Sequence, residues 1–322
     1  MANAWANAKA KATSAQDNAQ TDKPPEKDLK AHYAQLFERK RSRTQSIRMA
    51  LVGKENTAKT GLAIDIARAH VGPDKQIVIL DVDNSAVQTV AHAYGGDPRI
   101  RVVPLFDEMD ESIFHEDNTT NWTALVDKMG FFVKVIAEQA AEGDIGAVII
   151  DGGSTFLKWC ESAMTDVLMN RSKNPVNVAD GDKFNQAEWR IRNQLFRDVM
   201  SRAHQLPVDA VFFTFHLKDV KQFADLGNGQ KGLMKVGEVP EWEKGTMRMF
   251  SQQLFMARYT KAGDIASGIR ADPEMEDGDW EIRATIEEMK GFNQEELGNT
   301  HTVLRVSGGK VEWFGLPMLK WE

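Results

Sequence analysis

The sequence predicts an α/β fold with a mostly parallel sheet that is covered by helices on both faces. Apolar segments of strand length recur along the chain, and segments with helical periodicity lie between them. This alternation is typical of parallel strands that are joined by helical crossovers. The predicted parallel strands are 47–52, 76–83, 100–105, 146–151 and 208–216.

Helical periodicity follows the first strand and returns in three longer segments. The predicted helices cover about 60–69, 121–142, 156–169 and 186–206. Towards the C-terminus the pattern changes to antiparallel strands, which are predicted at 252–260 and 280–289 around an acidic turn. A closing hairpin is predicted at 302–306 and 310–314, because Ser307-Gly308-Gly309 separates two alternating segments.

The N-terminal segment has a composition unlike that of the rest of the chain. Residues 1–28 are rich in Ala, Asn, Lys and Gln, which predicts a disordered arm, and 29–45 is predicted to be a helix. The basic end of this helix, Arg39–Arg43, has two interpretations: cations that favour a helix C-terminus, or a docking surface for a neighbouring subunit or a phosphate backbone. Residues 46–322 are predicted to form the main domain.

Composition narrows the functional class. The 322-residue chain has a net charge of −7, so any surface that binds nucleic acid must be local. Cys160 is the single cysteine, which suits a reducing compartment. No apolar run reaches the roughly 18 residues of a membrane span, and no hydrophobic signal peptide is present. We therefore expect a cytoplasmic protein without a membrane partner.

A predicted phosphate loop connects the first strand to the first helix. Backbone N–H groups of such a loop and of the helix N-terminus bind phosphate oxygens. Lys59 is expected to reach the terminal phosphates, and the Thr60 hydroxyl to hold Mg²⁺. Ala58 stands where this motif normally has glycine, and a negative φ there would leave room for phosphate. The candidate binding residues are Gly53, Lys54, Glu55, Asn56, Thr57, Ala58, Lys59, Thr60 and Gly61.

Polar side chains follow three of the other predicted strands. Asp83, Asp151 and His216 come at the carboxyl ends of their strands, where open α/β sheets bind ligands. Asp151 is a candidate Mg²⁺ carboxylate. Asp83 is either catalytic or the cap of the next helix, and Asp81 competes with it for the catalytic role.

These motifs, in this order, resemble the RecA-like P-loop ATPase family. The closest resemblance is to the phage-type RecA-like proteins of single-strand annealing and recombination. The resemblance covers roughly residues 47–314 and implies ATP and Mg²⁺ as cofactors. It implies that Lys59 and Thr60 bind the nucleotide and that Asp83 activates the attacking water, where the family uses glutamate. It also implies that Asp151 orders Mg²⁺ and that His216 acts as a polar switch.

The resemblance further implies partners. A homo-oligomeric ring or filament would face single-stranded DNA with the loops at about 170–185 and 218–246. The second of these is rich in lysine and glycine, and Lys231 and Lys235 are its candidate DNA contacts, with Phe223 and Trp242 for base stacking. Lys290 is a candidate for the neighbouring subunit's nucleotide site. Two alternatives stay open: a ring-forming DNA motor (a helicase or packaging ATPase), or a nucleotide-binding structural or regulatory protein without turnover.

Overall fold

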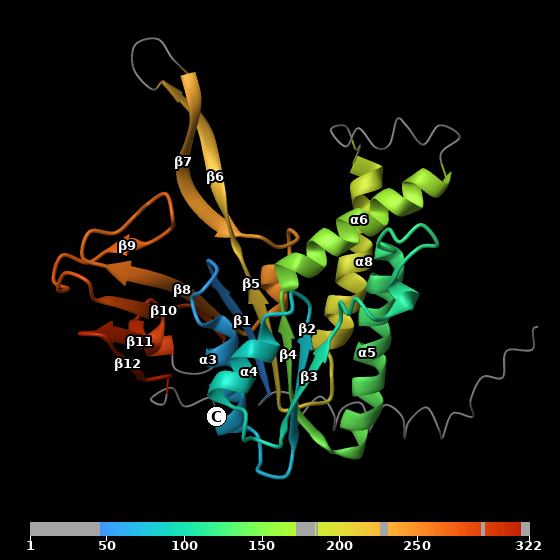
Figure 1. Ribbon diagram of the computed structural model, residues 1–322, viewed down its shortest axis with the longest axis horizontal. Coiled ribbons are helices and arrows are strands. Elements are labelled where there is room, and N and C mark those ends of the chain that lie inside the picture. The colour runs from blue at the N-terminus through green and yellow to red at the C-terminus, as the bar shows by residue number, and fades with distance from the viewer. Residues whose placement is uncertain (1–45, 172–183, 185, 226–230, 291–293, 317–322) are drawn as a thin grey trace, which may run out of the picture. The chain divides into compact units, whose positions relative to one another are not determined.

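A computed structural model describes residues 46–171, 184, 186–225, 231–290 and 294–316 (Figure 1). All of them belong to the unit Gln45–Glu322, one of two units into which the chain divides. The predicted arm at 1–28, the predicted helix at 29–45 and most of the predicted loop at 170–185 lie outside the described residues.

The first predicted strand lies in the interior of a large sheet. Strand β1 (Ile47–Gly53) is buried along its whole length and pairs in parallel with β5 and β8. The order β8-β1-β5-β4-β2-β3 is parallel throughout, and β5 separates β1 from the strand that ends in Asp151. The bounds are β2 (Gln76–Asp81), β3 (Ile100–Pro104), β4 (Ile145–Asp151), β5 (Ala210–Phe215) and β8 (Gln252–Thr260).

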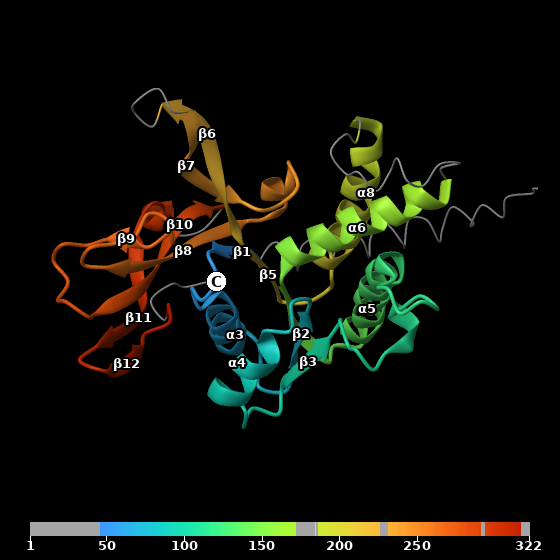
Figure 2. The ribbon, with the colours of Figure 1, turned by 45° about the horizontal axis from the view of Figure 1, so that its top comes forward.

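Helices cover both faces of this sheet, as predicted. Alternate β1 residues belong to two cores: Met49 and Leu51 pack with α3, whereas Ala50 and Val52 pack in the core that holds α5, α6 and α8. Figure 2 shows the two helix groups on opposite sides of the strands. The helices are α3 (Lys59–His70), α4 (Ala86–Ala93), α5 (Trp122–Glu142), α6 (Gly153–Arg171) and α8 (Gln186–His204), with 3₁₀ turns at Glu111–Ile113, Thr246–Met249 and Gln294–Glu296.

An antiparallel extension continues the sheet beyond β8. Strand β10 (Trp280–Met289) pairs with β8, β11 (Thr300–Ser307) with β10, and β12 (Lys310–Trp313) with β11. The short strand β9 (Arg270–Ala271) adds to β8 in parallel. The predicted closing hairpin is confirmed, and its turn uses the positive φ of Gly308 and Gly309.

The prediction of a long loop at 218–246 is wrong. Residues in this range form an antiparallel hairpin of β6 (Leu217–Asp225) and β7 (Lys231–Pro240), which continues from β5 away from the sheet (Figure 1). Glycine content made the segment resemble a loop, but Val220, Phe223, Val236 and Val239 provide the β-branched and aromatic side chains that favour strands. Cross-strand pairing between distant residues stabilises strands that local composition does not reveal.

The coarse fold class is therefore confirmed as α/β with a mostly parallel sheet and a C-terminal antiparallel hairpin. Several predicted boundaries shift, and two of the shifts bear on the site. Strand β2 ends at Asp81, so Asp83 lies in the following turn, and β5 ends at Phe215, just before His216. Within the described ranges, every helix is too short or too polar to cross a lipid bilayer.

Candidate functional site

The loop at 53–60 is a compact turn between β1 and α3. Gly53 is required at its start, because a Cβ there would lie 2.5 Å from the backbone oxygen of Met256 and 2.6 Å from Thr57 Oγ1. Buried Thr57 donates its hydroxyl to the carbonyl oxygen of Lys54 at 2.8 Å. The loop thus holds its shape through its own contacts.

Ala58 does not have the negative φ that would leave room for phosphate. Ala58 is the N-cap of α3 with φ 59° and ψ 24°, and Asn56 also has a positive φ. Left-handed backbone costs an alanine about 1–2 kcal/mol, which glycine avoids. No side chain caps α3 and its first turn has no acidic residue. The helix N-terminus, with its positive dipole end, therefore has no anionic side chain of its own.

Ala58→Gly should hold or raise the free energy of unfolding, by up to about 1 kcal/mol, because relief of left-handed strain exceeds the added freedom of the unfolded chain. Chemical denaturation measures the change. Ala91→Gly is the matched control, since Ala91 is exposed in α4 and its replacement should cost about 1 kcal/mol. If Ala58→Gly lowers the free energy of unfolding as much as Ala91→Gly does, Ala58 is not strained.

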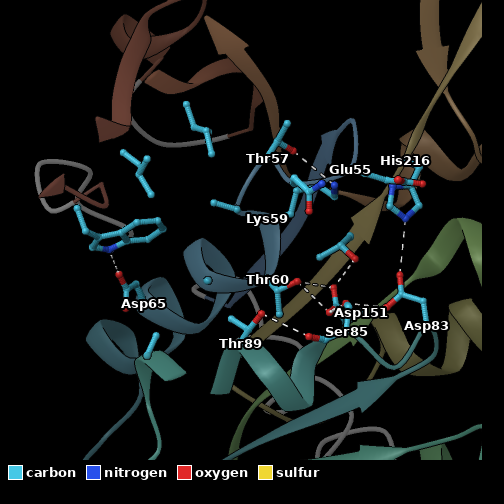
Figure 3. A pocket seen from close by; sticks show the side chains of 18 of the residues that line it. Glu55, Thr57, Lys59, Thr60, Asp65, Asp83, Ser85, Thr89, Asp151 and His216 are labelled. Carbon is cyan, nitrogen blue, oxygen red and sulfur yellow. Dashed lines mark hydrogen bonds and ion pairs between the residues drawn. The ribbon is translucent and has the colours of Figure 1, made fainter. Parts of the chain in front are cut away.

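Lys59 is buried within the loop. Its side-chain Nζ donates to the carbonyl oxygens of Lys54 at 2.7 Å and Gly53 at 3.1 Å. Figure 3 shows Lys59 beside Thr57, whose Oγ1 lies 3.5 Å from Nζ. Burial lowers the pKa of Lys59 to about 8, although the charges of Asp151, Asp83 and Glu55 oppose the shift. An ammonium group that is desolvated in this way is stabilised when an anion approaches it.

Asp151 gathers hydroxyl groups from three elements. Thr60 Oγ1, at the start of α3, lies 2.9 Å from each carboxylate oxygen. Thr214 Oγ1 donates to Oδ1 at 2.7 Å, and Ser85 Oγ to Oδ2 at 3.2 Å. Burial and the nearby charge of Asp83 raise the pKa of Asp151. The predicted Thr60–Asp151 pair is thus in direct contact, 91 residues apart in sequence.

The structure separates the roles of the two competing aspartates. Asp81 is fully buried and accepts hydrogen bonds from the backbone N–H groups of Ser85, Ala86 and Val87, so Asp81 caps α4. Burial and the charges of Asp151 and Asp83 raise the pKa of Asp81 to about 6. The bonds from the N–H groups of Ala86 and Val87 make Asp81, rather than Asp83, the main cap of this helix.

Asp83 points into the cavity instead. Its Oδ1 accepts a hydrogen bond from the Ser85 hydroxyl at 2.8 Å, and its Oδ2 lies 3.6 Å from His216 Nε2. Burial opposes ionisation, but the approach of His216 and Ser85 outweighs it and lowers the pKa of Asp83. The carboxylate is therefore ionised at neutral pH and accepts hydrogen bonds.

His216 connects the site to the hairpin. It directly precedes β6, and its backbone N–H donates to Ser154 Oγ at 2.9 Å. Within the described part of the chain, its buried Nδ1 has no hydrogen-bond partner. The imidazole of His216 thus faces Asp83, and the backbone of His216 leads directly into β6 of the hairpin.

These residues line one cavity of about 1080 Å³ (Figure 3). Its polar part is formed by the loop, the first turn of α3 and the carboxyl ends of the parallel strands. Its other part is an apolar wall of side chains from the antiparallel extension, namely Trp280, Ile282, Leu304, Val311 and Trp313. Of the residues predicted from sequence, the cavity brings together Glu55, Asn56, Thr57, Ala58, Lys59, Thr60, Gly61, Asp83, Asp151 and His216.

Two predicted lysines point elsewhere. Lys54 Nζ lies 2.7 Å from Asp219 Oδ1 and 3.5 Å from Glu238 Oε1, both on the hairpin. Lys290 donates to the carbonyl oxygen of Phe250 and pairs with Glu288 at 2.9 Å. Lys290 follows the end of β10 that pairs with the start of β8. It therefore lies near the amino ends of the parallel strands, whereas the loop lies at their carboxyl ends. Its role in a neighbouring subunit's site stays a prediction.

Sequence reasoning missed many of the residues that line the cavity, and three of them matter most for the site. Ser85 and Thr214 bond to Asp151, and Trp313 of β12 lines the apolar wall. Thr214 stands one residue before the end of β5, a position that could have indicated it. The sequence carries no local signal for Trp313, because only the order of the strands brings the last hairpin beside α3.

No model of a known protein family matches this sequence, and a search of curated proteins finds no match either. Function is therefore inferred from the residues of the site.

Proposed function

We propose that this protein binds and hydrolyses ATP at the cavity and is a RecA-like P-loop ATPase. The observation that carries the proposal is the contact between Thr60 and Asp151 beside buried Lys59, at the uncapped N-terminus of α3. A cation, free helix N–H groups and a hydroxyl–carboxylate pair are the groups that phosphate and Mg²⁺ require. The order of the motifs along the chain supports the RecA-like assignment.

The donor set at Asp151 fits Mg²⁺. Ligand oxygens of Asp81, Asp83 and Asp151 lie within 4.8 Å of one another, and oxygen ligands are what this ion prefers. Thr60 and Asp151 would hold it, while Asp81 is already used as a helix cap. When bound, Mg²⁺ supplies charge neutralisation at the phosphates and at the three carboxylates.

In this proposal Asp83 orients the attacking water for in-line displacement of the terminal phosphate. Its lowered pKa keeps the carboxylate ionised, so it accepts a hydrogen bond from water. Lys59 would exchange its bonds with the loop carbonyls for bonds to phosphate oxygens. His216 then reports the state of Asp83 to the hairpin, since the two side chains are adjacent.

The hairpin is the proposed surface for single-stranded DNA in recombination or annealing. Phe223 is 78% exposed and Leu233 58%, and Lys218 and Lys221 are exposed on the same two-stranded sheet. Exposed aromatic and cationic side chains together suit an unpaired strand. Trp242 packs against Phe215 and Phe250 instead, so stacking is assigned to Phe223 alone. A homo-oligomer, as a ring or filament, would multiply these contacts.

Lys218 and Lys221 replace Lys235 among the proposed DNA contacts. Lys235 pairs with Asp219 at 3.1 Å and Glu238 at 2.7 Å, and only 15% of its side chain is exposed. Its charge is therefore balanced within the hairpin, and we expect it to contribute to hairpin stability rather than to DNA binding. The side chain of Lys231 lies outside the described residues.

Phe223→Ala should weaken binding of single-stranded DNA roughly 5- to 150-fold through lost base stacking. Lys218→Ala with Lys221→Ala should lower the dependence of log affinity on log salt by about 0.7 for each lysine. Fluorescence anisotropy with a labelled oligonucleotide measures both. Lys134→Ala on α5 removes another exposed lysine and is the control. Unchanged affinity and salt dependence in the hairpin variants would remove the hairpin from the DNA surface.

ATPase measurements with increasing single-stranded DNA test the function as a whole. DNA-stimulated turnover supports the proposal. Binding without turnover would instead support a structural or regulatory nucleotide-binding protein. Separation of a DNA duplex would identify a ring-forming motor.

A further inference from the structure

The apolar wall of the cavity is built by register across three strands. Ile282 of β10 pairs with Leu304 of β11, which pairs with Trp313 of β12, and all three line the cavity. Trp280 and Val311 form a second row, because both pair with Val306. Side chains in the same register lie on the same face of a sheet, so the two rows form a continuous surface.

The outer part of this wall is open to solvent. Val311 is 68% exposed and Trp313 39%, whereas Ile282 is buried. An open apolar surface that is rimmed by polar groups marks a binding site on a soluble protein. The phosphate-binding residues proposed above do not account for this surface, because phosphate oxygens gain nothing from apolar contact.

Trp313 is fixed close to the proposed phosphate site. A Cβ on Gly61 would lie 3.5 Å from Trp313 Cη2, which places the indole one residue beyond Thr60 on the first turn of α3. The indole Nε1 donates to the Asp65 carboxylate (Figure 3), and the Tyr94 hydroxyl donates to the other oxygen of Asp65 at 2.8 Å. Asp65 of α3 and Tyr94, which follows α4, thus fix the orientation of the Trp313 indole.

We propose that Trp313 is the platform for the nucleobase, and that the wall selects purine nucleoside triphosphates over pyrimidine ones. This inference rests on the proposed nucleotide function and extends it to the base. A base that is attached to phosphates at Lys59 and Thr60 has the apolar wall within the same cavity. A purine covers more of the indole and of exposed Val311 than a pyrimidine does, so the purine gains more from stacking and burial.

Isothermal titration calorimetry with two probes, MgATP and magnesium tripolyphosphate, tests this inference. Trp313→Ala should weaken MgATP binding roughly 5- to 150-fold, which is the range for loss of one stacked base. Its affinity for tripolyphosphate, which has no base, should equal that of the parent. Trp313→Phe should recover most of the MgATP affinity. The parent should bind MgATP and MgGTP more tightly than MgCTP and MgUTP.

Phe314→Ala is the matched control, because Phe314 is the next residue along the chain and does not line the cavity. It should bind both probes as the parent does. Equal MgATP affinity in Trp313→Ala and the parent overturns the inference while the proposed function stands. The same holds if Trp313→Ala changes only the oligomeric state, which would make the wall a subunit contact. If the parent binds neither probe, the proposed function fails and the inference with it.

Discussion

Lys59→Ala should reduce ATP affinity at least about 100-fold, since hydrogen bonds to a charged group contribute about 1.5–3 kcal/mol each. The fold should survive, because burial already disfavours the ammonium, as its lowered pKa indicates. Nucleotide titration measures the affinity, and circular dichroism during heating measures the stability. Unchanged ATP affinity and turnover in this variant would refute the phosphate site.

Lys54→Ala provides a matched control for that experiment. It removes the same charge from the same loop, but the Lys54 ammonium contacts Asp219 and Glu238 rather than the cavity. ATP affinity should therefore fall far less than in Lys59→Ala. Equal losses in the two variants would show that the loop acts through its total charge and not through a dedicated lysine.

Asp83→Asn should slow turnover by a factor of about 10²–10⁴, the range for loss of a general base, with little change in ATP affinity. Asparagine keeps the size of the side chain but cannot hold an anionic acceptor beside His216. Steady-state kinetics that separate kcat from KM provide the measurement. Normal turnover would exclude Asp83 as the group that orients water.

Asp151→Asn is the companion variant. Asp151 accepts from the Thr60 and Thr214 hydroxyls, so its replacement should raise the Mg²⁺ concentration needed for half-maximal activity. Asp81→Asn should instead lower the free energy of unfolding, because Asp81 caps α4 through backbone N–H groups. A metal requirement that shifts with Asp81 rather than Asp151 would reverse these two assignments.

The parallel half of the fold was predictable because its strands are continuous apolar segments. Their polar ends could also be predicted to meet, since parallel strands have their carboxyl ends at one edge of the sheet. Asp83, Asp151 and His216 were found in this way, whereas Lys59 and Thr60 were found from the loop motif between the first strand and the first helix. The choice between Asp81 and Asp83 was not predictable, because it depends on which carboxylate turns back to the N-terminus of α4.

Features that depend on long-range pairing could not be predicted from local pattern. The β6–β7 hairpin contains glycines and lysines at positions that locally resemble a loop. The wall residue Trp313 reaches α3 only because β12 is the outermost strand of an extension that bends back to it. The left-handed φ of Ala58 is also set by context, since alanine itself disfavours it.

The ion pairs between the 53–60 loop and the hairpin have a thermodynamic consequence. Lys54 and Lys235 share Asp219 and Glu238, so two cations and two anions balance one another across the two segments. Lys54 also supplies the carbonyl oxygen that holds the Lys59 ammonium. A displacement of Lys54 therefore changes both its ion pairs with the hairpin and its bond to Lys59 in the loop. Thermodynamic linkage makes this coupling reciprocal. If the proposed nucleotide binds at the loop, a ligand that moves Lys54 at the hairpin changes the affinity for the nucleotide, and the nucleotide changes the affinity for that ligand by the same factor.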